Sequence, residues 1–372
     1  MTTRRVLLLS LFVGLALCVA SPAGAGSFKV AAIYSLTGQA AAQNGPSVEG
    51  VRVAGEEINA RGGILGMPLE LVVLDNRGTP IGAKVAAEEA ARLGVLAIIG
   101  CNWSSHSLAA AQVAQANGIP MISNISTHPD VTRVGDYIFR VCFTDDFQGK
   151  VMASFAHRDL GASTAVNVVD ISDDYSLGLA REFQQHFTAM GGGLVPDVTY
   201  KHTQEDFKDA AAAAAMAKVD VCFIPGHDES GRILDLMHQL GSTCVPLGGD
   251  GWGSGKFYPL GGERLALGYY CTHWHPDSEE PASKAFVARY GRKGPVDPSM
   301  ALAYDALMLL ADAAARAGKP GRAAIRDALA ATTDFVGVTG KIAFDTTGDP
   351  VKGGVIMRIA NGRADFFKFL AP

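Results

Sequence analysis

The sequence is poor in cysteine and in positive charge, and each shortage excludes a class of protein. Only six of the 372 residues are cysteines, and their spacing fits neither a disulfide-rich scaffold nor a zinc site. The formal net charge is −5 at pH 7, and no run of lysines and arginines follows the first residues. We therefore expect no nucleic-acid partner.

The sequence signatures of nucleotide sites and of several enzyme classes are also missing. No G-x-G-x-x-G follows the first expected strand, and no G-x-S-x-G elbow occurs. Residues 255–256 resemble the end of a phosphate-binding loop, but Asp250 stands where its first glycine belongs and Phe257 replaces the Ser or Thr. Two histidines in 273–275 could bind a metal, although such pairs on an extended segment usually serve packing. We expect no enzymatic activity, no cofactor and no metal ion.

Long apolar runs are scarce, and the one at the start of the chain has the features of a secretion signal. Arg4 and Arg5 precede the apolar run 6–20, which is too short for a stable membrane span. The small residues at 23–25 suit a signal peptidase. We predict a signal peptide over residues 1–25, cleaved after Ala25, and a mature protein in the periplasm.

The cysteine count leaves the disulfides open. Cys18 lies within the predicted signal peptide, and a lipid anchor on it is an alternative that Leu17 disfavours, because a lipidation box has a small residue before its cysteine. The remaining cysteines allow at most two disulfides, and the sequence does not indicate which of them pair. They are Cys101, Cys142, Cys222, Cys244 and Cys271.

From Phe28 onward, short apolar runs alternate with helical patterns. This alternation predicts an α/β fold with parallel sheets covered by helices on both faces. The chain is too long for one ordinary core, and the pattern restarts after 144–146. We predict two Rossmann-like lobes. Lobe 1 would comprise 26–145 plus 273–350, and lobe 2 would comprise 146–272 plus 351–372, with a three-strand hinge where the chain crosses.

Polar residues follow two expected strands of lobe 1. The apolar run 95–99 leads to Ser104, which with Ser105 stands where a helix N-cap belongs, and the run 119–122 leads to Thr127. Ligands of open α/β sheets bind beyond the carboxyl ends of strands, where a helix N-terminus attracts an anion. These residues therefore predict a site for a small carboxylate. The alternative is that each hydroxyl only caps a helix or forms a turn.

Carboxylates and aromatic rings follow the expected strands of lobe 2. Tyr175 comes after the strand 165–169, His227 after 219–224, and Asp250 after 245–248. A carboxylate together with aromatic rings can hold an ammonium group. The two lobes together then complement an α-amino acid.

Several short stretches of the mature chain occur in the order and at the spacing of one known family. They are 36–38, 56–63, 98–100, 122–127, 137–140, 175–179, 248–251, 303–306 and 339–342. Over nearly its whole length the mature chain resembles the periplasmic substrate-binding proteins of branched-chain amino acid ABC transporters. The resemblance implies a type I clamshell with a three-strand hinge. It also implies a monomer that delivers its ligand to a membrane permease.

The resemblance also implies roles for residues at matching positions. In lobe 1, Ser104 would bind the ligand carboxylate, Thr127 both the carboxylate and the amino group, and Ile125 would offer only its backbone carbonyl. In lobe 2, Asp250 would pair with the ligand ammonium, where the family usually has glutamate, and Tyr175 would lie over the ligand. His227 falls near a second aromatic position of the family.

Other positions depart from the family pattern. Asn102 and Trp103 stand where leucine-type binders have apolar pocket residues, and Gln43 replaces a usual tyrosine. Trp252 adds a large ring beside Asp250, although simple packing is an equal alternative for both tryptophans. We predict an amino acid ligand that is branched-chain or related, or else bulkier or more polar.

Three other functions remain open at this point. The ligand could instead be an amide, urea or an aromatic acid, none of which would need the carboxylate of Asp250. The protein could be a ligand-sensing partner of a membrane receptor, since sensing and uptake both use a closing clamshell. An exported α/β enzyme has the least support, because no nucleophile–base pair emerges.

Overall fold

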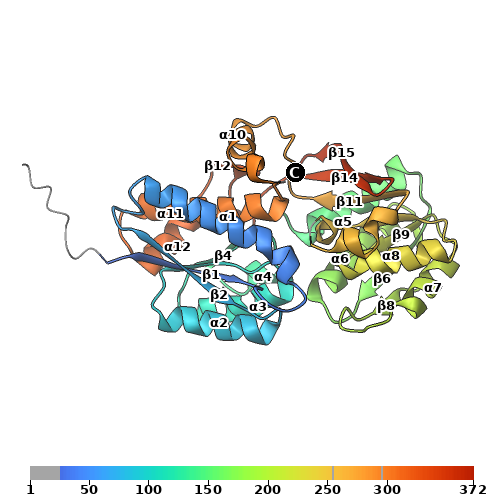
Figure 1. Ribbon diagram of the computed structural model, residues 1–372, viewed down its shortest axis with the longest axis horizontal. Coiled ribbons are helices and arrows are strands. Elements are labelled where there is room, and N and C mark those ends of the chain that lie inside the picture. The colour runs from blue at the N-terminus through green and yellow to red at the C-terminus, as the bar shows by residue number, and fades with distance from the viewer. Residues whose placement is uncertain (1–25, 254, 295) are drawn as a thin grey trace, which may run out of the picture.

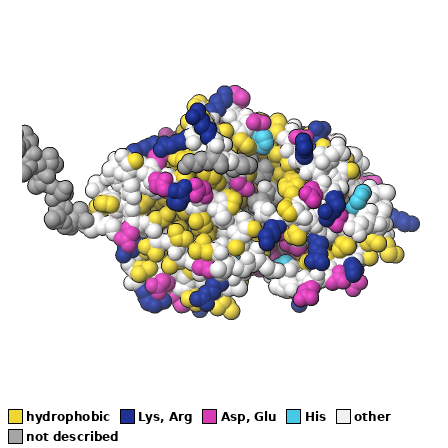
Figure 2. Space-filling view, in the orientation of Figure 1, with side chains coloured by type: hydrophobic (Ala, Val, Ile, Leu, Met, Phe, Trp, Pro, Cys, Tyr) yellow, Lys and Arg dark blue, Asp and Glu magenta, His cyan; other side chains and the backbone are white. Residues whose placement is uncertain are grey.

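The computed structural model shows two α/β lobes side by side (Figure 1). It describes residues 26–253, 255–294 and 296–372, so the predicted signal peptide lies outside the described residues. Each lobe has a sheet with parallel core strands and helices on both faces, which confirms the predicted fold class. Within the described ranges, no helix is both long and apolar enough to cross a membrane. Lys/Arg and Asp/Glu side chains are interspersed on the face seen in Figure 2.

Lobe 1 is built on a parallel sheet with the strand order β2-β1-β3-β4-β5. The strands are β1 (Phe28–Tyr34), β2 (Leu69–Asp75), β3 (Ala97–Gly100), β4 (Met121–Ser123) and β5 (Ile138–Arg140). Its helices are α1 (Ala41–Ala60), α2 (Pro80–Arg92), α3 (Ser104–Ala116), α4 (Asp130–Arg133), α10 (Pro281–Tyr290), α11 (Pro298–Ala317) and α12 (Arg322–Ala330). Helices α1, α11 and α12 cover one face of the sheet, and α2 and α3 cover the other.

The central strand β1 shows why the strands of this sheet are continuous apolar runs in the sequence. Val30 and Ala32 pack in the core beneath α1 and α11, whereas Ala31 and Ile33 pack beneath α2 and α3. A strand buried on both faces needs apolar side chains at every position. Because all strands of this sheet are parallel, their carboxyl ends lie at the same edge of lobe 1. Ligands of α/β folds bind at that edge.

Lobe 2 has a larger, mixed sheet in the order β15-β14-β11-β10-β9-β6-β7, with β8 also pairing with β6. The strands are β6 (Thr164–Asp170), β7 (Gly193–Leu194), β8 (Val198–Tyr200), β9 (Val221–Ile224), β10 (Val245–Gly248), β11 (Leu267–Thr272), β14 (Gly354–Ala360) and β15 (Arg363–Leu370). The helices are α5 (Asp145–Ser154), α6 (Asp174–Ala189), α7 (Lys208–Met216), α8 (Glu229–Gln239) and α9 (Phe257–Leu260). Strands β14 and β15 run antiparallel and complete the edge beside β11.

The chain passes between the two lobes between β5 and α5, between β11 and α10, and again before β14, after the hairpin β12 (Phe335–Gly337) and β13 (Gly340–Ile342). Two buried cations link the first of these crossings to the third. Arg140 Nε donates to Asp349 Oδ1 at 2.5 Å, and Lys352 Nζ donates to Val141 O at 2.9 Å and to the Thr339 hydroxyl. Burial lowers the pKa of Lys352 to about 8, although the negative charge of Asp305 acts to raise it. The crossings are therefore cross-linked by polar contacts.

A disulfide in lobe 2 answers the question that the cysteine count left open. Cys222 on β9 is bonded to Cys244, just before β10, across a sequence separation of 22 residues. Cys101, Cys142 and Cys271 are buried free thiols. The disulfide therefore links two adjacent parallel strands at the edge where they begin.

We expect removal of this disulfide to destabilise lobe 2 by about 3 kcal/mol, because closing a loop of this length restricts the unfolded chain by roughly that amount. The measurement is guanidinium unfolding of the C222A/C244A double variant and of wild type with and without reductant. Cys271→Ala, which removes a buried thiol outside the disulfide, is the control. Equal unfolding midpoints for oxidised and reduced wild type would contradict this expectation.

Candidate functional site

A cavity between the lobes collects residues from the carboxyl ends of both sheets. Its lining residues are Gln43, Asn102, Trp103, Ser104, Ile125, Thr127, Tyr175, His227, Asp250, Gly251 and Ser299. Every site residue predicted from the sequence lines this cavity except Trp252. The cavity volume is ≈ 30 Å³. Most of them lie in the loops, or at the helix starts, that follow β3, β4, β6, β9 and β10, as expected for an α/β ligand site. Gln43 and Ser299 come instead from the first turns of α1 and α11.

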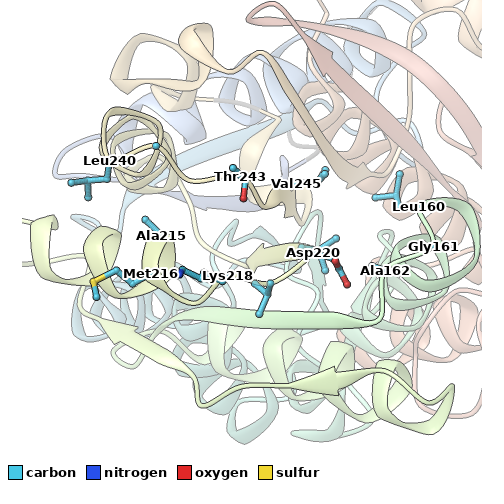
Figure 3. Close-up of a pocket in the computed structure, with 13 residues that line it drawn as sticks. Leu160, Gly161, Ala162, Ala215, Met216, Lys218, Asp220, Leu240, Thr243 and Val245 are labelled. Atoms are coloured by element: carbon cyan, nitrogen blue, oxygen red, sulfur yellow. The ribbon is translucent and has the colours of Figure 1, made fainter.

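A larger groove of ≈ 790 Å³ lies at the opposite edge of the lobe 2 sheet, before β9 and β10. Met216 and Leu240 lie at one end of it and Leu160 at the other (Figure 3). Asp220, the one carboxylate in its lining, already accepts four hydrogen bonds at 2.9–3.0 Å. The donors are the backbone N–H and the hydroxyl of Ser163 and of Thr164. Lys218 also lines this groove, which lies at the end of the sheet opposite the loops where ligand sites of α/β folds form.

The lobe 1 side of the cavity is the N-terminus of helix α3. The helix begins at Ser104, and Trp103 rather than a serine occupies the N-cap, with no side-chain hydrogen bond to the helix end. The sequence had placed the cap one or two residues later, and that expectation was wrong. Ser104 Oγ accepts from His128 N at 3.2 Å and keeps its proton for a ligand. An uncapped helix N-terminus with a hydroxyl beside it is suited to a carboxylate.

The other hydroxyls of this region form a structural network instead. Ser126 Oγ lies 2.7 Å from Ser107 Oγ and donates to Asn102 O at 2.8 Å. These bonds join the loop after β3 to the loop after β4 and are fully buried. These serines therefore have a structural role that joins two loops rather than caps a helix, whereas Ser104 and Thr127 line the cavity.

On the lobe 2 side, Asp250 opens a short 3-10 turn directly after β10. Its Oδ1 accepts from Gln148 Nε2 at 3.0 Å, and its Oδ2 lies 3.0 Å from His273 Nε2. Burial alone would raise the pKa of Asp250, but the hydrogen bonds from His273 and Gln148 outweigh it and hold the pKa below its usual value. Burial lowers the pKa of His273. At neutral pH this end of the cavity therefore carries a carboxylate charge beside a neutral imidazole.

A stack of aromatic rings crosses from lobe 1 to lobe 2 along the cavity. The Trp103 indole lies between His106, at 5.4 Å, and His227, at 4.3 Å and 3° from parallel, and His227 stacks in turn on Tyr175 at 5.0 Å. Burial opposes protonation of His227, yet the carboxylate of Asp173, whose Oδ2 lies 3.3 Å from His227 Nε2, raises its pKa to about 9. A cationic imidazole against an indole face is favourable. The stack therefore joins the two lobes through direct ring contacts.

A sequence model of the periplasmic binding protein family matches residues 27–364, which is most of the chain. The chain belongs to this family. This confirms the resemblance that the short stretches of sequence suggested.

Characterised relatives extend the likeness over nearly full length. The Leu/Ile/Val-binding protein BraC3 of Rhizobium johnstonii is 28% identical over 88% of this chain and 90% of its own. The leucine-, isoleucine-, valine-, threonine- and alanine-binding protein of Pseudomonas aeruginosa is 27% identical, over 87% of each chain.

Solved structures of the family agree with the fold. The leucine-binding protein LivK of Thermotoga maritima superimposes with a TM-score of 0.88 at 37% identity, over 92% of this chain and 99% of that one. LivJ of Streptococcus pneumoniae, solved with isoleucine, gives 0.87 at 29% identity, over 93% and 100%. A benzoate-bound binding protein of R. palustris gives 0.83 at 21% identity and shows the shared fold alone.

Trp252 is the predicted site residue that does not line the cavity. Its side chain is fully buried in the lobe 2 core, its ring stacks on Phe257 at 4.8 Å, and its Nε1 donates to Ile224 O at 3.1 Å. Successive residues of a 3-10 turn point about 120° apart, so Trp252 faces the core while Asp250 faces the cavity. The packing interpretation is the correct one for this tryptophan.

His273 and Gln148, which contact the Asp250 carboxylate, were not predicted as site residues from the sequence. His273 directly follows β11, so the strand-end rule that selected Asp250 also applied to it. It had been considered only as half of a metal pair with His275. Within the described part of the chain, no group of three or more His, Cys, Asp or Glu residues could hold a metal ion. Gln148 lies inside α5, and no local pattern in the sequence points to it.

A buried acid beside the cavity makes stability depend on pH. Asp145 is fully buried next to Thr127 and Gln148, and burial, with the charge of Asp250, raises its pKa to about 8. The folded protein therefore holds a proton that the unfolded chain releases above about pH 4. Stability must fall as the pH rises from there to about 8, and the loss levels off above that.

We expect Asp145→Asn, which stays neutral, to remove this loss. Without ligand, the melting temperature of the variant relative to wild type should climb from pH 5 to pH 8 and then stay level. Thermal unfolding across this range measures the difference, with the exposed Asp277→Asn as control. A constant difference between Asp145→Asn and wild type at every pH would show that Asp145 is ionised in the folded protein.

Proposed function

We propose that this periplasmic binding protein captures an α-amino acid, branched-chain or related, between its lobes and delivers it to the permease of an ABC transporter. The observation that carries the proposal is the pairing of opposite features across one cavity. An uncapped helix N-terminus with Ser104 lies on one lobe, and the ionised Asp250 lies on the other. An α-amino acid presents a carboxylate and an ammonium group to match them.

The first step is docking of the ligand on lobe 1. Its carboxylate would receive hydrogen bonds from the Ser104 hydroxyl and the first backbone N–H groups of α3, whose dipole favours an anion. Thr127 would bind the carboxylate and the amino group, with the carbonyl of Ile125 as a further acceptor for the ammonium. Both residues line the cavity on the same side.

The second step is closure of lobe 2 over the docked ligand. Closure brings Asp250 to the ammonium and Tyr175 over the ligand, so the ligand has a higher affinity for the closed form and shifts the population toward it. Gln43 Nε2 donates to Asp228 Oδ1 at 3.0 Å, and Trp103 packs on His227, so the lobes also contact each other directly. A transporter permease would then recognise the closed form.

The family supports the remaining parts of the proposal. The relatives with 27–37% identity are named as binders of branched-chain amino acids, and one is named as part of a transporter. The predicted signal peptide would bring the protein to the periplasm, where it would act as a monomer without cofactor or enzymatic activity. Aromatic acids fit less well, because a ligand without an ammonium group would leave the buried charge of Asp250 unpaired.

A thermal-shift screen tests this function. The mature protein is heated with each of the α-amino acids, with small amides and urea, and with aromatic acids. A ligand that binds only the folded state raises the melting temperature by mass action. We expect shifts with one or a few α-amino acids. Shifts confined to amides, urea or aromatic acids would overturn the proposal while leaving the fold in place.

A further inference from the structure

The cavity between the closed lobes is small for this family's kind of ligand. Its volume of ≈ 30 Å³ is two to three times the roughly 10–15 Å³ that a single water molecule needs. Four of its lining residues, Ser104, Thr127, Tyr175 and Asp250, surround the place of the ligand's carboxylate and ammonium groups. The space left for a side chain is therefore set by the remaining wall.

That wall is dominated by a tryptophan that cannot easily move. The Trp103 side chain is buried, and its ring lies against His106 on one side and His227 on the other. Its Nε1 donates to Gln43 Oε1 at 2.8 Å, and the edge of the ring meets His202 at 5.6 Å. Moving the indole aside would break contacts to both lobes at once.

The polar residues of the same wall do not select a polar side chain. Gln43 uses its amide for Trp103 and for Asp228. Asn102 Nδ2 donates to the Gln43 carbonyl at 3.3 Å, and its Oδ1 accepts from Asn124 at 3.0 Å. Both amides are therefore engaged within the protein. The other polar residues of this wall are engaged as well, since Ser299 Oγ donates to Asp297 Oδ1 at 2.5 Å and His227 Nε2 lies 3.3 Å from Asp173 Oδ2. Size, rather than polarity, is therefore what this wall discriminates.

We propose that Trp103 is the specificity-determining residue of this site and limits it to small α-amino acids, of the size of glycine, alanine or serine. The inference rests on the proposed function, because it assumes that an α-amino acid occupies the cavity, and it narrows the ligand of that function from branched-chain or related amino acids to small related ones. A branched side chain of leucine size would have to displace the indole and the stack that joins the lobes. Discrimination by pocket size alone is moderate, on the order of 10–200-fold per methylene-scale difference.

The test measures dissociation constants of wild type and Trp103→Ala for L-alanine and L-leucine by calorimetry. Wild type should bind alanine at least about tenfold more tightly than leucine, and Trp103→Ala should shift the ratio toward leucine by at least about tenfold. The ratio matters because losing the stack weakens closure for both ligands alike. His202→Ala is the matched control, since it removes a ring contact to Trp103 outside the cavity and should leave the ratio unchanged.

Each outcome decides the inference. Leucine bound by wild type as tightly as alanine, or an unchanged ratio in Trp103→Ala, overturns the role of Trp103 and leaves the proposed function standing. Binding of no α-amino acid at all to wild type overturns both. If Trp103→Ala does not fold, the alanine-to-leucine ratio of wild type decides by itself.

Discussion

We expect Asp250→Ala to weaken binding of the proposed amino acid ligand by about 2–5 kcal/mol, or roughly 30-fold to several thousandfold. The reason is that closure buries the ligand ammonium against this carboxylate, and its removal leaves a buried charge without a partner. The carboxylate is already positioned by Gln148 and His273, each at 3.0 Å. Isothermal titration with the ligand found in the screen measures the loss.

Two comparisons make the Asp250 result specific. Asp250→Asn keeps the shape of the side chain and should lose most of the same affinity, because the charge rather than the volume is responsible. Asp235→Ala removes a carboxylate of lobe 2 that pairs with Arg264 on the surface and should bind as wild type does. Unchanged affinity in Asp250→Ala for every ligand that binds wild type would remove this residue from the site.

Trp252→Ala should lower the free energy of unfolding of lobe 2 by about 3–5 kcal/mol, the usual cost of truncating a large buried aromatic side chain. The ring is fully buried, stacks on Phe257, and donates its Nε1–H to Ile224 O. Truncation therefore leaves a cavity, while Ile224 O keeps its hydrogen bond from Gly226 N at 2.9 Å. Guanidinium unfolding followed by tryptophan fluorescence and circular dichroism measures the loss.

The exposed Phe369→Ala serves as the control for Trp252, because more than half of its side chain already faces solvent. It should change stability by less than about 0.5 kcal/mol. If Trp252→Ala were as stable as this control while ligand affinity collapsed, the tryptophan would belong to the binding site and not to the core.

The sequence predicted the fold class and most of the cavity lining because both follow from local patterns. Continuous apolar runs indicated parallel strands buried on both faces, and the residues just after those runs had to meet at one edge of each sheet. Ser104 and Asp250 could be selected in this way without any structure. Both line the cavity.

What the sequence did not predict depends on side-chain direction and on distant contacts. Trp252 lies two residues from Asp250, and only the 3-10 turn shows that the two side chains point to different sides. The contact of Gln148 with Asp250 joins positions 102 residues apart, and the contact of His273 with Asp250 crosses from another strand. The pairing of Cys222 with Cys244 likewise depends on the adjacency of β9 and β10.

The central claim is that one lobe binds a carboxylate and the other an ammonium group of the same small molecule. The most direct measurement is calorimetric titration of the best amino acid from the screen beside two analogues, one lacking the amino group and one with the carboxylate converted to an amide. The account predicts that both analogues lose at least about tenfold in affinity, and that Asp250→Ala no longer distinguishes the amino acid from its deaminated analogue. Equal binding of the deaminated analogue to wild type would contradict it.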